Sequence, residues 1–86
     1  MATVVYKKQP EKYLKSVEAA VYEKLTKALE GLGQDTGDVV KLKGSKYYRL
    51  KIEHYRAIFT RDNATGTITI VELNTRTNIK YRRWQQ

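Results

Sequence analysis

The side chains with the greatest chemical capacity in this chain are cationic and phenolic. The sequence contains 17 lysines and arginines, seven tyrosines, one histidine and no cysteine. An arginine fork suits a phosphate group, and a lysine whose pKa is lowered by neighbouring cations can accept a proton. A tyrosine can stack on a base or carry a proton. Together these groups could cleave RNA without a metal, with the ribose 2′-hydroxyl attacking the adjacent phosphorus.

Other hydrolytic chemistries are poorly supported. The sequence has no cluster of histidines or carboxylates with metal-ligand spacing, and without cysteine it has neither a thiolate zinc site nor a disulfide framework. The two serines, Ser16 and Ser45, lie outside a nucleophile-elbow context. The glycines of residues 31–37 lack the lysine and hydroxyl residue of a phosphate-binding loop. We therefore expect no metal and no cofactor.

The stretch Tyr47–Thr60, YYRLKIEHYRAIFT, would bring three of the cations together. Its alternation predicts two strands joined by a short turn near Glu53–His54. The apolar residues would face a core, and Arg49, Lys51 and Arg56 would face the opposite side. Because like charges this close repel one another, a polyanion is a natural partner for that side. The alternative is an ordinary solvated sheet face, where lysine and arginine are common.

The distribution of charge favours a polyanion. The chain has a formal net charge of +8 and a pI near 9.8. Residues 1–40 contain six basic and six acidic side chains, whereas residues 41–86 contain eleven basic and three acidic ones. The mixed first half is typical of a solvated helix surface. The excess on the second half indicates a nucleic acid or an acidic protein as the partner.

The rest of the sequence predicts the elements that position these side chains. Thr3–Tyr6 is typical of a short strand, and Pro10 suits the first turn of a helix. An apolar stripe then predicts one helix or a helical hairpin, with the stripe formed by Leu14, Val17, Val21, Leu25, Ala28 and Leu32. Gly33 is expected to cap the helix end. Thr67–Leu73, TITIVEL, alternates as a further strand after a hairpin turn.

These elements predict one α+β domain over residues 1–86. An N-terminal strand and a helical hairpin would precede an antiparallel sheet of three to four strands, with the helices on one face. Val39–Gly44 would be a basic link into the sheet, and Asn74–Trp84 a short basic and aromatic tail. The chain start lacks the apolar core of a signal peptide, and no apolar run reaches membrane-spanning length. We therefore expect a cytoplasmic protein with no membrane partner.

The motifs in this order resemble the RelE/ParE superfamily of type II toxin–antitoxin toxins. The residues that carry the resemblance are Leu42-Lys43-Gly44, then YRLKI at Tyr48–Ile52 and YRAIF at Tyr55–Phe59, and the closing Arg76 and Tyr81. The resemblance covers essentially the whole chain and implies a RelE-like fold. In the RelE branch of the superfamily, the toxin enters the ribosomal A site and cleaves mRNA. In the ParE branch, it poisons DNA gyrase instead.

The resemblance also implies roles for individual residues. Arg49 and Lys51 match two basic strand residues that face the RNA. Arg56 matches an arginine of the next strand that holds the scissile phosphate. Arg76 and Tyr81 match an arginine and a tyrosine near the C-terminus, which are assigned to contact with the phosphate or the leaving group and to base stacking. These five residues are the expected catalytic set.

A wider set of basic side chains is expected to contact RNA around the catalytic set. Their charge would attract ribosomal RNA, and such attraction weakens steeply with salt. The set consists of Lys41, Lys43, Lys46, His54, Lys80, Arg82 and Arg83. The spacing after Arg76 also allows Lys80, in place of Tyr81, to hold the outer catalytic position.

Three functions follow from these observations. The leading hypothesis is a toxin that acts as a ribosome-dependent, metal-independent endoribonuclease on mRNA. The alternatives are a ParE-like toxin that inhibits DNA gyrase without nuclease activity, and a plain nucleic-acid-binding module. Either toxin implies a cognate antitoxin, an acidic or amphipathic protein that wraps the toxin and covers its basic face. The ribosome and mRNA would be the other partners, and operator DNA would be bound only through the antitoxin.

Overall fold

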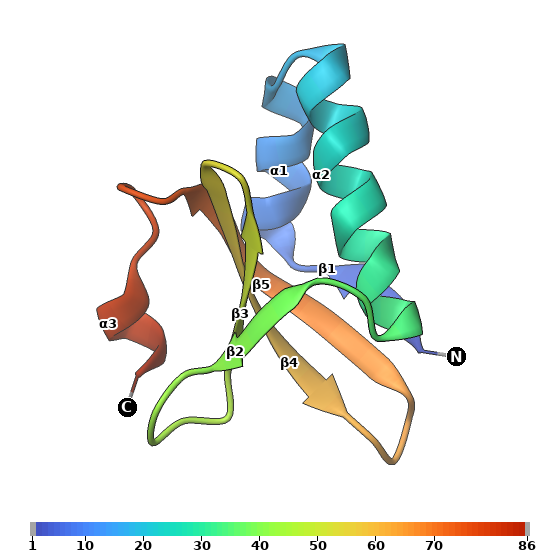
Figure 1. Cartoon of the computed structure of the whole chain (residues 1–86), viewed down its shortest axis with the longest axis vertical. Coiled ribbons are helices and arrows are strands. Elements are labelled where there is room, and N and C mark those ends of the chain that lie inside the picture. The colour runs from blue at the N-terminus through green and yellow to red at the C-terminus, as the bar shows by residue number, and fades with distance from the viewer. Residues whose placement is uncertain (1, 86) are drawn as a thin grey trace.

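A five-stranded sheet forms the centre of the computed structural model, which describes residues 2–85 (Figure 1). In chain order its strands are β1 (Thr3–Tyr6), β2 (Asp38–Lys41), β3 (Tyr48–Ile52), β4 (Tyr55–Asp62) and β5 (Thr67–Thr75). In space their order is β1-β5-β4-β3-β2. Strand β1 pairs with β5 in parallel, and the other neighbours are antiparallel. The N-terminal strand therefore occupies one edge of the sheet and β2 the other.

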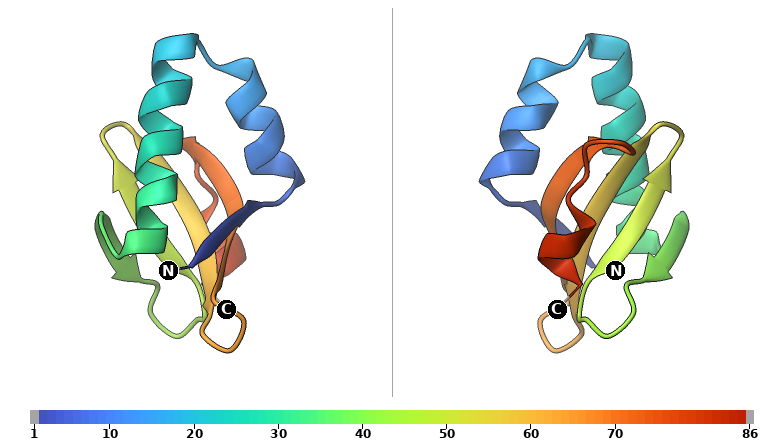
Figure 2. Two further views of the ribbon diagram at one scale, coloured as in Figure 1. Left: turned by 90° about the vertical axis from the view of Figure 1, so that its right-hand side faces the viewer. Right: turned by 90° about the vertical axis from the view of Figure 1, so that its left-hand side faces the viewer.

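Two helices form the predicted hairpin on one face of the sheet. They are α1 (Lys8–Ser16) and α2 (Ala19–Gly31), and the chain between them is extended at Val17 and Glu18. Figure 2 shows the hairpin in front of the sheet in one view and behind it in the other. Among residues 2–85, no helix is long and apolar enough to cross a membrane.

The main core lies between the hairpin and the sheet. Its buried side chains are Leu14, Leu25, Leu29 and Leu32 from the helical half, and Leu50, Ile52, Ala57, Phe59, Ile68, Ile70 and Leu73 from the strands. Full burial of a large apolar side chain contributes roughly 1.5–3 kcal/mol each. This core therefore determines which face of each strand is turned toward the helices.

The α+β class is confirmed, and the sheet contains one strand more than predicted. Strands β3, β4 and β5 are the antiparallel strands expected from the sequence, β2 is a fourth, and β1 adds a fifth through its parallel pairing with β5. The prediction of a link over Val39–Gly44 was wrong in its first part, because Asp38–Lys41 forms strand β2. This segment contains two β-branched valines and pairs with the whole of β3, from Asp38 opposite Lys51 to Lys41 opposite Tyr48.

The end of α2 also differs from the prediction. The helix ends at Gly31 and continues as a short 3-10 helix, η1 (Leu32–Gln34). Asp35, not Gly33, then adopts the left-handed conformation, with φ of 57°. A Cβ atom on Gly33 would lie only 2.8 Å from the carbonyl oxygen of Ala2. Gly33 is therefore needed because the N-terminal strand approaches it closely.

The C-terminal segment packs against the sheet face opposite the hairpin. Leu42, Ile58 and Ile79 form a second buried cluster there, and Trp84 packs against it. The segment ends in α3 (Tyr81–Trp84), which Figure 2 shows on the side of the sheet away from the hairpin. The segment predicted as a basic and aromatic tail over Asn74–Trp84 thus begins as the end of β5, and its apolar side chains cover part of the sheet.

The hydroxyl of Tyr6 on β1 generates a prediction about alkaline stability. It donates a hydrogen bond of 2.6 Å to Glu30 Oε2 on α2. Burial, with the Glu30 carboxylate adding to it, raises the pKa of Tyr6 above its ordinary value of 10.0. The folded state therefore favours the protonated hydroxyl, and this stabilisation is fully present below the unfolded pKa and is lost as the pH rises toward the folded pKa.

We expect the free energy of unfolding to fall between about pH 10 and pH 12 in the wild-type protein, and to fall less in Tyr6→Phe. Urea titrations at a series of pH values measure both slopes. Equal alkaline slopes in the two proteins would contradict the assignment.

Candidate functional site

Strand pairing gathers the predicted cations on the sheet face opposite the hairpin, which we call the outer face. Lys51 on β3 is the direct cross-strand partner of Arg56 on β4, and Arg49 lies two residues before Lys51. Residues two apart on a strand, and direct partners across strands, point to the same side. Across four strands, one outer-face row contains Asp38, Lys51, Arg56 and Asn74, and the next contains Val40, Arg49, Ile58 and Glu72.

Arg49 is held half-buried beside a surface hollow. Its Nη2 lies 3.7 Å from Asp38 Oδ1, with 21% of the Arg49 side chain exposed. Its buried Nε has no hydrogen-bond partner among residues 2–85. A hollow of about 290 Å³ beside it is also lined by Val40, Leu42, Tyr81 and Gln85. One long ion pair leaves donors of this guanidinium available to an anion that enters the hollow.

Arg56 is held by the backbone of the turn between β3 and β4. Its Nη1 donates to the carbonyl oxygens of Glu53 and Tyr55, each at 2.8 Å. These acceptors carry no net charge, so they orient the guanidinium without neutralising it. The exposed Lys51 lies directly opposite on β3. The pair therefore presents two positive charges from adjacent strands.

Arg76 and Tyr81 come from the C-terminal segment, which leaves the end of β5 and continues to α3 (Figure 1). The backbone N–H of Arg76 donates to the carbonyl of His54 at 2.7 Å, and its side chain is exposed. Tyr81 is half-buried against the second cluster and lines the hollow beside Arg49. Lys80 instead lines a separate hollow beside Glu72. Lys80 and Tyr81 were the two candidates for the last catalytic position, and of these Tyr81 is the one beside Arg49.

The wider basic set divides between two regions of the molecule. Lys41, Lys43 and Lys46 lie at the end of β2 and in the loop before β3, and His54 lies in the turn at the opposite end of β3. Lys80, Arg82 and Arg83 lie on the C-terminal segment, and all seven side chains are exposed. An edge contact between Tyr47 and Trp84, with ring centroids 4.9 Å apart, places α3 near the loop. Lys41 occupies the inward-facing row of β2 with Val39, and His54 lies at the far end of β3. The structure therefore brings the other five side chains toward one end of the outer face.

Glu72 is a residue of this face that the sequence reasoning missed. It is the one charged side chain that is buried among residues 2–85, at 5% exposure. Its carboxylate accepts hydrogen bonds from Trp84 Nε1 at 2.7 Å and from the backbone N–H of Lys80 at 3.2 Å. A buried carboxylate is costly unless it is hydrogen-bonded, so these donors hold α3, and Tyr81 with it, on the sheet. The available signal is that Glu72 is one of three acidic residues in the basic half.

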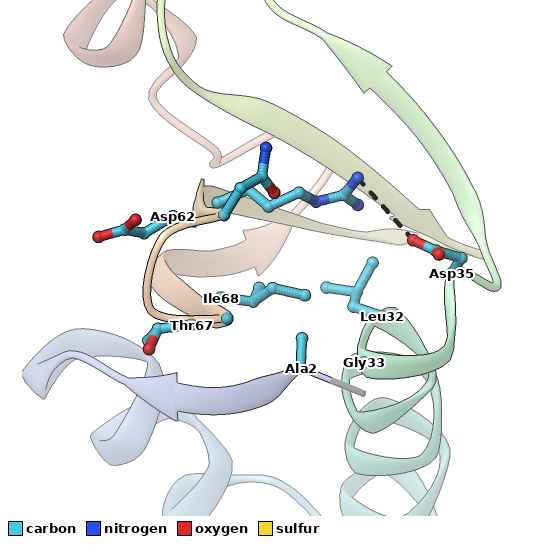
Figure 3. A pocket seen from close by; sticks show the side chains of 10 residues that line it. Ala2, Leu32, Gly33, Asp35, Asp62, Thr67 and Ile68 are labelled. Carbon is cyan, nitrogen blue, oxygen red and sulfur yellow. Dashed lines mark ion pairs between the residues drawn. The ribbon is translucent and has the colours of Figure 1, made fainter.

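One arginine lies away from this site. Arg61 continues the inward-facing positions of β4, and its guanidinium lies 5.3 Å from the ring centre of Tyr48. Its Nη1 forms an ion pair with Asp35 Oδ1 at 4.0 Å, beside a hollow of about 400 Å³. Figure 3 shows this hollow, with Asp35, Ala2 and Ile68 among the residues that line it. Arg61 therefore closes the end of the main core on the helix side.

The outer face as described can bind a phosphodiester and stabilise negative charge on it. Two guanidinium groups, one ammonium group and one phenol lie on or beside the same two strands. Arginine forks form short, charge-assisted hydrogen bonds with phosphate oxygens. Within residues 2–85, no group of three or more histidine and carboxylate side chains is placed to bind a metal ion.

Solved structures that share this fold include toxins and toxin–antitoxin complexes. The chain matches one in the archaeal RelE–RelB complex from Pyrococcus horikoshii with a TM-score of 0.71 and 27% identity, over 91% of this chain and 98% of that one. It matches the isolated E. coli RelE toxin with a TM-score of 0.75 and 15% identity, over 96% and 93%. It matches a chain of the RelB–RelE complex from Methanococcus jannaschii with a TM-score of 0.69 and 22% identity, over 92% of this chain and 96% of that one. No family model and no curated protein sequence matches the chain.

The contact between Glu72 and Trp84 predicts an energetic coupling. Trp84→Phe keeps an aromatic ring but removes the donor to the buried carboxylate, so we expect it to lower the free energy of unfolding by about 1–3 kcal/mol. In a Glu72→Leu background, which has no carboxylate to satisfy, the same substitution should cost much less. Urea titrations of the four proteins measure the difference. The same cost in both backgrounds would show that the hydrogen bond does not hold α3.

Proposed function

This chain has the fold of a RelE-like toxin, and from that premise we propose that it is the toxin of a type II toxin–antitoxin pair and cleaves mRNA on the ribosome. The observation that carries the proposal is the pairing of Lys51 with Arg56 on the outer face, with Arg49 on the same strand as Lys51. A set of cations on one exposed sheet face suits a ribose-phosphate backbone better than a protein surface of mixed charge.

The chemistry needs no group beyond these side chains and the RNA. The ribose 2′-oxygen forms a bond to the adjacent phosphorus while the bond from phosphorus to the 5′-oxygen breaks. One basic group takes the 2′-hydroxyl proton, and one acidic group gives a proton to the leaving 5′-oxygen. The products are a 2′,3′-cyclic phosphate and a 5′-hydroxyl.

Each residue of the site has a place in this reaction. The guanidinium groups of Arg56 and Arg49 hold the phosphate oxygens as negative charge develops on them. Lys51 is directly opposite Arg56, so a phosphate held by Arg56 would also meet its ammonium group. Tyr81 lines the hollow next to Arg49 and offers a ring to a base there. Arg76, whose backbone is bonded to the β3–β4 turn at His54, is the residue proposed for contact with the phosphate or the leaving group.

The proposed partner is an antitoxin with an acidic or amphipathic segment. The matched structures from Pyrococcus horikoshii and Methanococcus jannaschii are complexes of RelE with RelB. In this chain, residues 41–86 hold eleven basic side chains against three acidic ones. A complementary segment that lies on the outer face would neutralise this excess and block RNA.

Wild-type protein added to translating ribosomes should cut the mRNA and leave 2′,3′-cyclic phosphate ends, which sequencing of the fragments detects. Arg56→Ala should lower the single-turnover rate by about 100-fold to 1000-fold, the usual effect of losing one donor to a developing oxyanion. The control is Lys27→Ala, which removes an exposed charge on α2, on the hairpin side of the sheet.

The wild-type result decides between the candidate activities. Intact mRNA on ribosomes exposed to the wild-type protein would contradict the proposal. If gyrase-dependent DNA breaks accumulated instead, the protein would be a ParE-like inhibitor. If Arg56→Ala and Lys27→Ala had equal rates, Arg56 would have no part in the reaction.

A further inference from the structure

The two-residue turn Glu53–His54, between β3 and β4, joins three parts of the molecule. The Glu53 carboxylate accepts a hydrogen bond from Lys24 Nζ on α2, with Oε1 and Nζ 2.9 Å apart. The Glu53 carbonyl accepts from Arg56 Nη1 at 2.8 Å, and the His54 carbonyl accepts from the backbone of Arg76 at 2.7 Å. Figure 2 shows this turn at the end of the sheet, beside α2. It therefore connects the hairpin on one face to two site residues on the other.

The backbone of Glu53 is in a conformation that glutamate rarely adopts. Its φ is +52°, in the left-handed region. Two-residue hairpin turns place glycine, asparagine or aspartate at such positions, because a longer side chain is disfavoured there. Strained backbone positions of this kind cluster at functional sites, so an observed one is a reason to ask what the side chain does.

Stability alone does not explain the glutamate. The ion pair with Lys24 is exposed, with 43% of the Lys24 side chain and 60% of the Glu53 side chain accessible. Ion pairs this exposed contribute little to the free energy of folding. Lys24 lowers the pKa of Glu53 through a hydrogen bond, and Glu53 raises the pKa of Lys24, so both groups are charged near neutral pH. The ion pair between Lys24 and Glu53 is therefore formed near neutral pH. Because it adds little to stability, we look for its effect in the position of the turn.

We propose that Glu53 and Lys24 are positioning residues for Arg56. Their ion pair ties the turn to α2 and fixes the direction of the two carbonyl groups, those of Glu53 and Tyr55, that hold the Arg56 guanidinium on the outer face. Loss of the pair frees the turn, so that Arg56 spends less time where a phosphate would meet it. This inference rests on the proposed function for its effect on the reaction, but not for its effect on the motion of Arg56.

Two variants break the ion pair from opposite sides. Lys24→Gln removes the charge on α2 and leaves the turn untouched. Glu53→Gly removes the carboxylate and also places at this left-handed φ a residue that adopts it without strain. The matched control is Asp35→Gly, because Asp35 also has a left-handed φ, of 57°, and is exposed, but lies at the core edge beside Arg61.

We expect both variants to lower the single-turnover cleavage rate by about tenfold, with ribosome affinity unchanged, since a misplaced group affects the transition state more than binding. Glu53→Gly should nevertheless unfold at a urea concentration no lower than the wild type, as should Asp35→Gly, because glycine suits both positions. Asp35→Gly should cleave at the wild-type rate. The swapped pair Lys24→Glu with Glu53→Lys should recover most of the lost rate.

A second measurement does not depend on cleavage. The order parameter of the Arg56 Nε–H group, from NMR relaxation, should fall in Lys24→Gln and in Glu53→Gly and stay unchanged in Asp35→Gly. If the wild type failed to cleave mRNA while these order parameters changed as stated, the proposed function would be wrong and the positioning role would stand. If the wild type cleaved, and both variants cleaved equally fast with an unchanged Arg56, the inference would be overturned.

Discussion

In the antiparallel pair of β3 and β4, every side chain points either toward the hairpin or toward the outer face. The main core takes Leu50 and Ile52 from β3 and Ala57 and Phe59 from β4. With these four buried, the period of two leaves no other side for the intervening cations. A slip of one residue in either strand would place charge in the core and apolar groups in water. The burial that stabilises the fold is therefore also what places the candidate site.

The outer face of the sheet is covered in one part and exposed in another. Ile58 sits among the outer-face cations and is fully buried, which requires that something cover it. The C-terminal segment does so over one part of the face, held by a buried carboxylate, and leaves the row of Lys51 and Arg56 accessible. The aromatic side chains of Tyr81 and Trp84 therefore lie on the same face as the cations Lys51 and Arg56. Such a face suits a ligand that has both planar bases and phosphates.

Local periodicity predicted the parts of the structure that depend on local pattern. Spacing alone predicted β3, β4, β5 and the common face of Arg49 and Arg56, whereas the apolar stripe allowed either one helix or a hairpin. The places of β1 and β2 did not follow, because they depend on pairing with strands far away in sequence. The packing of Tyr81 beside Arg49 was implied only by the resemblance, since it depends on the direction of a segment that has no periodicity.

The remaining site features depend on contacts between residues that are distant in sequence. Lys24 and Glu53 are 29 residues apart, and each is unremarkable as a surface charge. In the sequence, Glu72 is one more polar residue of an alternating strand. Only the fold brings Trp84 next to it. No single-sequence pattern predicts such pairs, because the fold has to exist before they meet.

The parallel pairing of β1 with β5 has a consequence for the order in which the molecule can assemble. Thr3 lies opposite Thr67, so β1 must remain without its neighbour until more than sixty further residues have been added. The nascent helical hairpin likewise lacks most of the surface on which its leucines rest. The sheet and the main core are therefore completed only after β5 has been synthesised.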